Sequence, residues 1–282
     1  MVRSFDNESS SDNKKANYII IFSIILFLGI ISLFFYSQYI DVPNDPITHC
    51  PTKELPRGEY VVLFDKTDSD KDSLLIELDV SKELSRIKEI LPQYAKLSIY
   101  IITDDKVGNY NPVKEPICNP GSLKDENWFV RMGIIGVPKD IQNDWEEKFA
   151  NIVDQDFKNL LSSSNSDFSP IFEMIQAVNI LNFKNSNNDY ENKLFIFSDM
   201  LHFMPNEFSL FKDQPNFDLF KKNNSAYYSE IRTTIRKNVT VEINLIPRKE
   251  KRQFQNNELE KFWLDYFNDM GSPFVIFNDI GK

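Results

Sequence analysis

A short stretch of the sequence, YVVLFDKTDS at residues 60–69, combines side chains whose oxygen atoms suit a metal ion. Asp65, Thr67 and Ser69 occupy alternate positions directly after five apolar residues. An unbroken apolar run predicts a strand covered on both faces, and open α/β sheets bind ligands at the carboxyl ends of such strands. One carboxylate and two hydroxyls offer only oxygen, which suits a hard cation such as Mg²⁺ or Mn²⁺.

Two later segments place more side-chain oxygen atoms at the ends of predicted elements. Ser169 precedes Pro170 at the start of an amphipathic segment, where we expect the serine to cap a helix. Ser198 and Asp199 end the apolar segment KLFIFSD. Caps and turns explain each of these residues when it is taken alone. The three loops together form a more specific pattern than any one of them.

The elements that would position these residues alternate between strands and helices. We expect strands at residues 60–64, 96–103, 193–199, 239–246 and 274–277. We expect helices at residues 72–94, 145–161, 170–181, 227–237 and 257–270, and a mobile polar region at 205–224. This alternation predicts an α/β fold with a doubly wound, mostly parallel, Rossmann-like sheet. Trp128, Trp145 and Trp263 are expected to pack in its core.

The first 40 residues differ in composition from the remainder of the chain. Residues 1–17 are polar and predicted to be disordered. Residues 18–40 contain no charged side chain and are long enough for a transmembrane helix. A cleaved signal peptide is the alternative, but no small-x-small cleavage site follows. Because Lys14 and Lys15 precede the span, the positive-inside rule predicts a cytoplasmic N-terminus and the remainder of the chain across the membrane.

Charge, prolines and cysteines complete the outline of the 282-residue chain. A formal net charge of −10 argues against a nucleic-acid partner. Four prolines predict a semi-rigid stalk at residues 41–58, followed by a domain at 59–282. With no CxxC motif, a zinc site is not expected. Cys50 and Cys118 form an even pair in a segment predicted to be outside the cytoplasm, so we expect a disulfide; two buried thiols are the alternative.

The DxTxS motif, the Ser-Pro pair and IFSDM resemble the three loops of a von Willebrand factor A domain, in the same order, over roughly residues 58–280. In that family these loops form a metal-ion-dependent adhesion site. The resemblance implies these ligands for Mg²⁺ or Mn²⁺: Asp65, Thr67, Ser69, Ser169 and Asp199. It implies that Asp68 and Ser198 lie just outside them. The chain departs from the family at Met200, where glycine is common, and in a longer, proline-rich segment at 104–123.

The resemblance implies a membrane-anchored binding module, without enzymatic activity, whose protein partner supplies a carboxylate to the metal. Similarity to single-span bacterial envelope proteins implies the inner membrane, with the domain periplasmic or extracellular. The alternative is a metal-dependent phosphatase of the haloacid-dehalogenase type, since FDKTD resembles its loop and would make Asp65 the nucleophile. That class has a second aspartate where Thr67 stands. His49 and His202 offer too few partners for a Ser-His-Asp triad, and His202 is expected to be a loop or pocket-wall residue.

Overall fold

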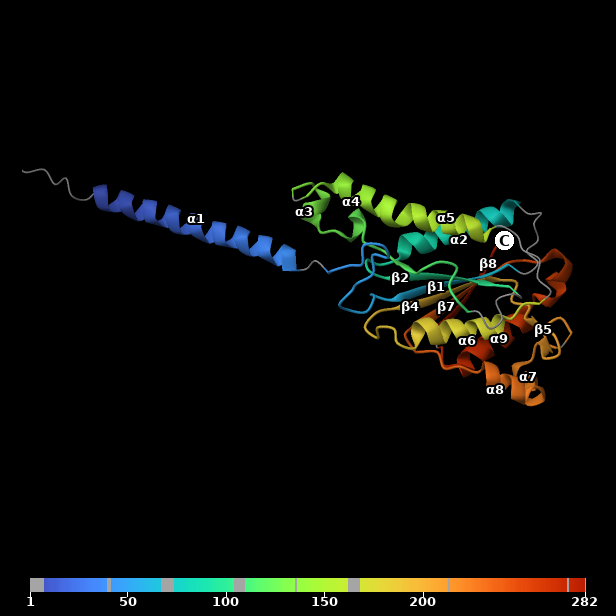
Figure 1. Ribbon diagram of the computed structural model, residues 1–282. Helices are drawn as coiled ribbons and strands as arrows, with labels where there is room; N and C mark the ends of the chain where they lie inside the picture. Colours follow the sequence, from blue (N-terminus) through green and yellow to red (C-terminus); the bar gives the residue numbers. More distant parts are fainter. Residues whose placement is uncertain are drawn as a thin grey trace, which may run out of the picture. The chain divides into compact units, whose positions relative to one another are not determined.

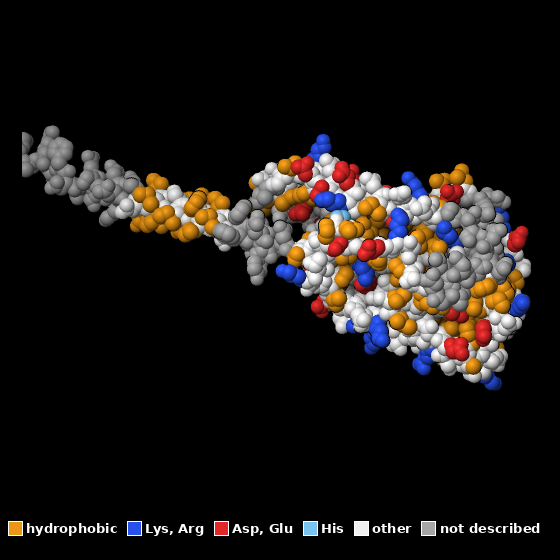
Figure 2. Space-filling view, in the orientation of Figure 1, with side chains coloured by type: hydrophobic (Ala, Val, Ile, Leu, Met, Phe, Trp, Pro, Cys, Tyr) orange, Lys and Arg blue, Asp and Glu red, His pale blue; other side chains and the backbone are white. Residues whose placement is uncertain are grey.

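The computed structural model describes residues 8–39, 42–66, 74–103, 110–134, 136–161, 168–212, 214–272 and 274–281. The chain divides into two compact units, Met1–Pro43 and Asn44–Lys282. The first unit contains helix α1 (Glu8–Tyr39), whose described side chains are mostly apolar and exposed (Figure 2). The second unit contains the sheet and all the residues of the candidate site that the structure describes.

The expected membrane span is not borne out. A spanning helix needs about 20 consecutive apolar residues. Within the described part of the chain, no helix combines the length and the apolar character needed to cross a membrane. The prediction of a transmembrane helix at residues 18–40 is therefore wrong, and with it the predicted location in the inner membrane.

A six-stranded sheet in the order β3-β2-β1-β4-β7-β8 forms the centre of the second unit (Figure 1). Its strands are β1 (Glu59–Asp65), β2 (Lys96–Ile102), β3 (Ile117–Cys118), β4 (Asn192–Ser198), β7 (Val239–Leu245) and β8 (Phe274–Asp279). The apolar run expected to be a covered strand is β1, and each of its residues is buried. It runs parallel to both neighbours, β2 and β4.

The sheet is mixed, because β3 pairs antiparallel with β2. The chain is thus α/β, as predicted, but the sheet is mixed and is not a plain parallel Rossmann-like sheet, and the described residues contain no membrane helix before it. Parallel neighbours need a long crossover, usually a helix, whereas an antiparallel strand can return directly. The described residues between β2 and β3, 103 and 110–116, contain no helix. The described part of the proline-rich segment, residues 110–123, therefore contributes a short antiparallel edge strand.

Helices cover both faces of the sheet (Figure 1). One face carries α2 (Leu74–Ile90), α4 (Pro138–Trp145), the π-helical turn η3 (Glu146–Ala150) and α5 (Asn151–Leu160). The other face carries α6 (Ile171–Val178), the π-helical turn η4 (Asn179–Phe183), α7 (Phe217–Asn223), α8 (Ser225–Ile231) and α9 (Asn257–Asp269). Each face has its own apolar core, so β1 and β4 are buried from both sides.

Several short elements correct the expectations from sequence. They are η2 (Leu123–Asp125), α3 (Trp128–Arg131), β5 (Phe203–Met204), β6 (Phe208–Ser209) and the 3₁₀ helix η5 (Lys249–Phe254). Residues 205–224, predicted to be mobile, include β6 and α7, because Phe217 and Phe220 pack into the core. Trp145 and Trp263 are buried, but Trp128 is 60% exposed on α3, which buries none of its four residues.

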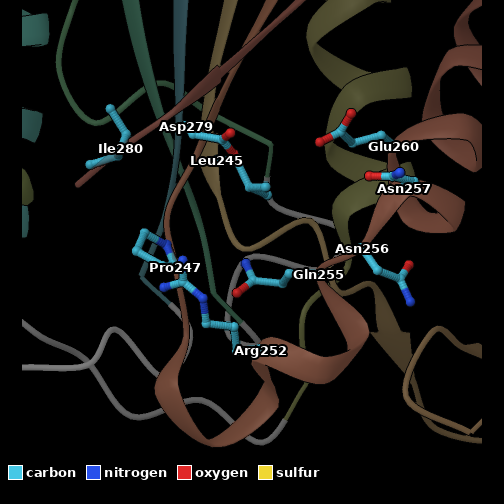
Figure 3. A pocket seen from close by; sticks show the side chains of 9 residues that line it. All are labelled: Leu245, Pro247, Arg252, Gln255, Asn256, Asn257, Glu260, Asp279 and Ile280. Carbon is cyan, nitrogen blue, oxygen red and sulfur yellow. The ribbon is translucent and has the colours of Figure 1, made fainter. Parts of the chain in front are cut away.

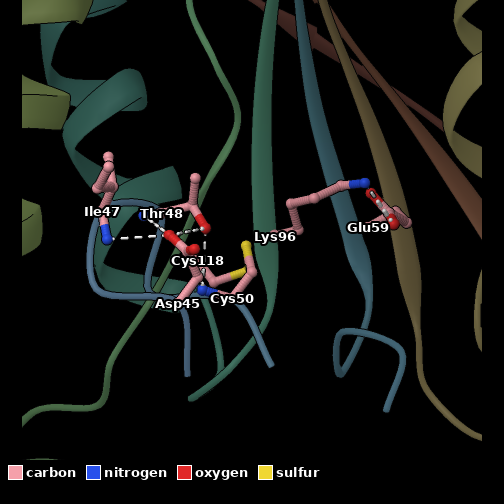
Figure 4. Close-up of a disulfide and its surroundings, with 7 residues drawn as sticks. All are labelled: Asp45, Ile47, Thr48, Cys50, Glu59, Lys96 and Cys118. Carbon is pink, nitrogen blue, oxygen red and sulfur yellow. Dashed lines mark hydrogen bonds and ion pairs between the residues drawn. A yellow bond between two sulfur atoms is a disulfide. The ribbon is translucent and has the colours of Figure 1, made fainter. Parts of the chain in front are cut away.

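A disulfide closes the end of the unit where β1 begins (Figure 4). Cys50 and Cys118 are joined with an S–S distance of 2.04 Å and a Cα–Cα distance of 4.8 Å. The turn before Cys50 is ordered by Asp45, whose Oδ1 accepts hydrogen bonds from the backbone N–H groups of Ile47 and Thr48. Residues 45–50 are thereby fixed to the short edge strand β3.

Candidate functional site

Parallel pairing brings Asp65 and Ser198 together at the carboxyl edge of the sheet. Phe64 of β1 pairs with Phe197 of β4, so the next residue of each strand lies at the same level. The Ser198 hydroxyl donates a 2.7 Å hydrogen bond to Asp65 Oδ2. Asp65 is only 4% exposed, so the bond is made away from bulk water. Two separate strands thus build the centre of the site.

Ser169 reaches the same carboxylate oxygen from a third segment. Its hydroxyl donates a 3.1 Å hydrogen bond to Asp65 Oδ2. The expected role as a helix cap is wrong: α6 begins at Ile171 after Pro170, with no side-chain cap. Two backbone hydrogen bonds between Ser169 and Phe203 of β5, 2.9 and 3.0 Å long, hold the serine in an extended bridge instead. The hydroxyl is therefore directed at Asp65.

Asp199 has both carboxylate oxygens engaged. Oδ1 accepts a 2.8 Å hydrogen bond from the backbone N–H of Leu201. Oδ2 forms a 2.8 Å ion pair with the guanidinium of Arg248, and the side chains are only 8% and 12% exposed. Arg248 lies three residues beyond Leu245, which pairs with Ser198 in the sheet. The ion pair therefore follows from the register of β4 and β7.

Gln255 ties the two loops of this ion pair together. Its Nε2 donates to the backbone carbonyls of Asp199 and Ile246, at 3.2 and 2.8 Å. Its Oε1 accepts a 2.8 Å hydrogen bond from the backbone N–H of Arg248. The Arg248 guanidinium also lies 5.9 Å from the centre of the Phe211 ring. The Gln255 hydrogen bond fixes the position of the Arg248 backbone, and the Phe211 ring restricts the direction of its side chain.

The loop after β4 turns sharply at Met200, which has a φ of 58°. This left-handed conformation costs a residue with a side chain about 1–2 kcal/mol, whereas glycine adopts it readily. Here the turn is held by the indole of Trp263 on α9, whose N–H donates a 2.9 Å hydrogen bond to the Met200 carbonyl.

Burial and neighbouring charges shift the pKa of Asp199. Burial, followed by the negative charge of Asp65, raises the pKa of Asp199, and the positive charge of Arg248 opposes that rise. Two carboxylates this close repel each other when both are ionised, and a nearby cation relieves the repulsion. Carboxylate and hydroxyl oxygens form the donor set, so the residues present fit Mg²⁺ or Mn²⁺.

The structure describes only part of the predicted ligand set. Asp65, Ser169 and Ser198 are in contact, and Asp199 lies close enough for its pKa to respond to Asp65. The remaining predicted residues, Thr67, Asp68 and Ser69, lie outside the described residues. Among residues that are described, no group of three or more His, Cys, Asp or Glu side chains gathers around a point that could hold a metal ion.

Comparisons with known proteins leave the family open. No family model matches the chain, and no curated protein does. Among solved structures it is similar to proximal thread matrix protein 1 from the mussel byssus, with a TM-score of 0.33 and 10% identity, covering 77% of this chain and 48% of that one. It is also similar to the human COPII-coat protein Sec24c, with a TM-score of 0.34 and 11% identity, covering 85% and 32%. The chain thus spans less than half the length of either, and similarity at this level supports no argument about function.

Sequence reasoning missed Arg248 and Gln255. The segment RKEKR at residues 248–252 is a local concentration of basic residues in an acidic chain, and that contrast was the available signal. His202 lies in the loop between β4 and β5, as expected, but it is fully buried and packs against Phe172 with a ring-centre distance of 4.3 Å. Its Nε2 lies 2.9 Å from the Tyr227 hydroxyl, so it belongs to the aromatic core.

A small polar cavity of about 120 Å³ adjoins the site beyond Gln255 (Figure 3). It lies where β7 and β8 end and α9 begins. Its lining residues are Leu245, Pro247, Arg252, Gln255, Asn256, Asn257, Glu260, Asp279 and Ile280. Gln255 therefore has one side on this cavity and its amide on the Asp199 loop, which makes the cavity a neighbour of the candidate site.

Proposed function

We propose that the chain binds a protein partner through a divalent cation at the carboxyl edge of its sheet, as a von Willebrand factor A-type module would. The observation that carries the proposal is the convergence of two hydroxyls, from Ser169 and Ser198, on one buried oxygen of Asp65. Three separate segments supply these groups. Roles in turns or helix caps would not by themselves bring both hydroxyls to the same carboxylate oxygen.

Each residue of the proposed site has a distinct part, although Thr67 and Ser69 lie outside the described residues. The proposed ligands of Mg²⁺ or Mn²⁺ are Asp65, Thr67, Ser69, Ser169 and Asp199. When bound, the cation would supply an open coordination position for a carboxylate oxygen of the partner. Ser198 would orient Asp65, as its 2.7 Å hydrogen bond indicates. The backbone N–H of Leu201 would orient Asp199 in the same way.

The proposal is tested by capture experiments on the full chain and two matched variants. Asp65→Asn removes the charge from the centre of the site and keeps the volume. Glu59→Gln is the control, because Glu59 is an equally buried carboxyl at the opposite end of the same strand. We expect the wild type and Glu59→Gln to retain a protein partner in Mg²⁺, to release it with a chelator and to rebind it when Mg²⁺ returns. Asp65→Asn should not retain it.

The same proteins distinguish the phosphatase alternative. A phosphatase would hydrolyse a phosphate ester in Mg²⁺ and would lose this activity in Asp65→Asn. That result would overturn the binding proposal. Capture of a partner that is unchanged by the chelator and by Asp65→Asn would also overturn it. Chelator-sensitive capture without hydrolysis would support it.

A further inference from the structure

Arg248 places a fixed positive charge on a carboxylate oxygen that the proposed cation needs. The guanidinium contacts Asp199 Oδ2 at 2.8 Å, in an ion pair that is nearly buried. Asp199 Oδ1 is already occupied by the backbone of Leu201. A cation that approaches Asp199 therefore meets a carboxylate whose charge is balanced by a group of the protein itself.

We infer that Arg248 is a positioning residue that holds Asp199 and weakens cation binding at this edge, an inference that rests on the proposed function. Like charges within a few ångströms oppose each other strongly where the surroundings are buried. The arginine and the cation share the same carboxylate. Affinity for the metal should therefore be limited by the protein's own guanidinium.

The position of Arg248 is built into the fold. Gln255 fixes the backbone N–H of Arg248 and the carbonyl of Asp199 with a single amide group. The strand register places Leu245 beside Ser198, which sets the starting points of both loops. Phe211 lies beside the guanidinium. The ion pair is thus part of the site and not a chance contact between long surface side chains.

The test measures Mn²⁺ binding by isothermal titration on the full-length wild type and Arg248→Gln. Removing the guanidinium should tighten Mn²⁺ binding about tenfold. A neighbouring charge commonly changes the proton affinity of a carboxylate by about this factor, and we expect a similar change in its affinity for a cation. Arg252→Gln is the matched control: it removes the same charge from η5, but Arg252 is exposed and lines the adjacent cavity. It should bind Mn²⁺ like the wild type. Arg248→Lys keeps the charge and should also stay close to the wild type.

Equal or weaker binding by Arg248→Gln than by Arg252→Gln would overturn the inference, as would a lack of Mn²⁺ binding by all four proteins. If circular dichroism shows that Arg248→Gln does not fold, Mn²⁺ binding is measured on Gln255→Ala instead. This variant removes the hydrogen bond that holds the Arg248 backbone and keeps the charge of Arg248. Tighter Mn²⁺ binding than the wild type would support the inference, and unchanged binding would overturn it. Tighter metal binding without chelator-sensitive capture of a protein would contradict only the proposed function.

Discussion

At the scale of single residues, the buried polar groups below the candidate site matter as much as the acidic ones. His202 is enclosed by aromatic rings, and its Nδ1 has no hydrogen-bond partner among the described residues. Burial lowers the pKa of His202 to about 3. Protonating this imidazole would put a charge in an apolar core, so the folded state holds it neutral.

This burial predicts a loss of stability in mild acid. In the unfolded chain a histidine has a pKa of about 6.5. Below that pH the unfolded state therefore binds a proton at His202 that the folded state does not bind. The free energy of unfolding should fall by about 1.4 kcal/mol per pH unit from about pH 6 towards pH 4. Urea unfolding of the wild type and His202→Phe at a series of pH values measures this, and the variant should lose that part of the slope.

Glu173 and Tyr227 provide an internal check on this prediction. Tyr227 donates a 2.6 Å hydrogen bond to Glu173, and burial raises the pKa of that carboxyl, so its protonation in acid favours the folded state. Its contribution opposes that of His202 and is common to both proteins. The difference between the two pH profiles therefore reports His202 together with its contact to the Tyr227 hydroxyl, and identical slopes would contradict the prediction.

At the scale of elements, helix α9 supports the loop that carries Asp199. Trp263 is fully buried and donates its indole N–H to the carbonyl of Met200. That carbonyl belongs to the one residue of the loop with a left-handed backbone. The helix thus secures a turn that the Met200 side chain itself disfavours.

Trp263→Phe should destabilise the protein by about 2–4 kcal/mol, because it leaves a buried carbonyl without its donor and creates a cavity. Tyr266→Phe is the matched control, one helical turn away on α9. Its hydroxyl is buried without a hydrogen-bond partner in the described structure, so its removal should cost little or increase stability. Thermal and urea unfolding measure both variants. Equal losses would show that the indole N–H does not hold the loop.

At the scale of the whole second unit, the disulfide ties the segment before β1 to the edge strand β3 of the sheet. Cys50 and Cys118 are separated by 68 positions in sequence. The backbone N–H of Cys118 also donates a 2.8 Å hydrogen bond to the carbonyl of Thr48. The covalent link and the hydrogen bond close the same loop.

Closing a loop of this length stabilises the folded state by about 4 kcal/mol in the chain-entropy description. The Cys50→Ser/Cys118→Ser double variant should therefore unfold at a markedly lower urea concentration than the oxidised protein. A reductant should shift the wild type towards the variant and leave the variant unchanged. Two thiols that titrate in the denatured, non-reduced protein would contradict the disulfide itself.

The sequence by itself determined the elements with strong local patterns. The unbroken apolar runs at 60–64 and 194–197 became the centres of β1 and β4, because a strand buried on both faces needs apolar side chains at successive positions. The acidic residues at the ends of those runs, Asp65 and Asp199, lie at the same edge of the sheet because both strands are parallel. An even cysteine pair was enough to expect the link between Cys50 and Cys118.

Only the tertiary structure decided the partners of these residues. Ser169 does not cap its helix, because a bridge to Phe203 turns its hydroxyl towards Asp65. Arg248 meets Asp199 through the register of two strands that are far apart in sequence, which no local pattern encodes. The antiparallel edge strand and the burial of His202 likewise depend on which segments become neighbours. Local propensity sets the elements, whereas long-range packing sets which side chains meet.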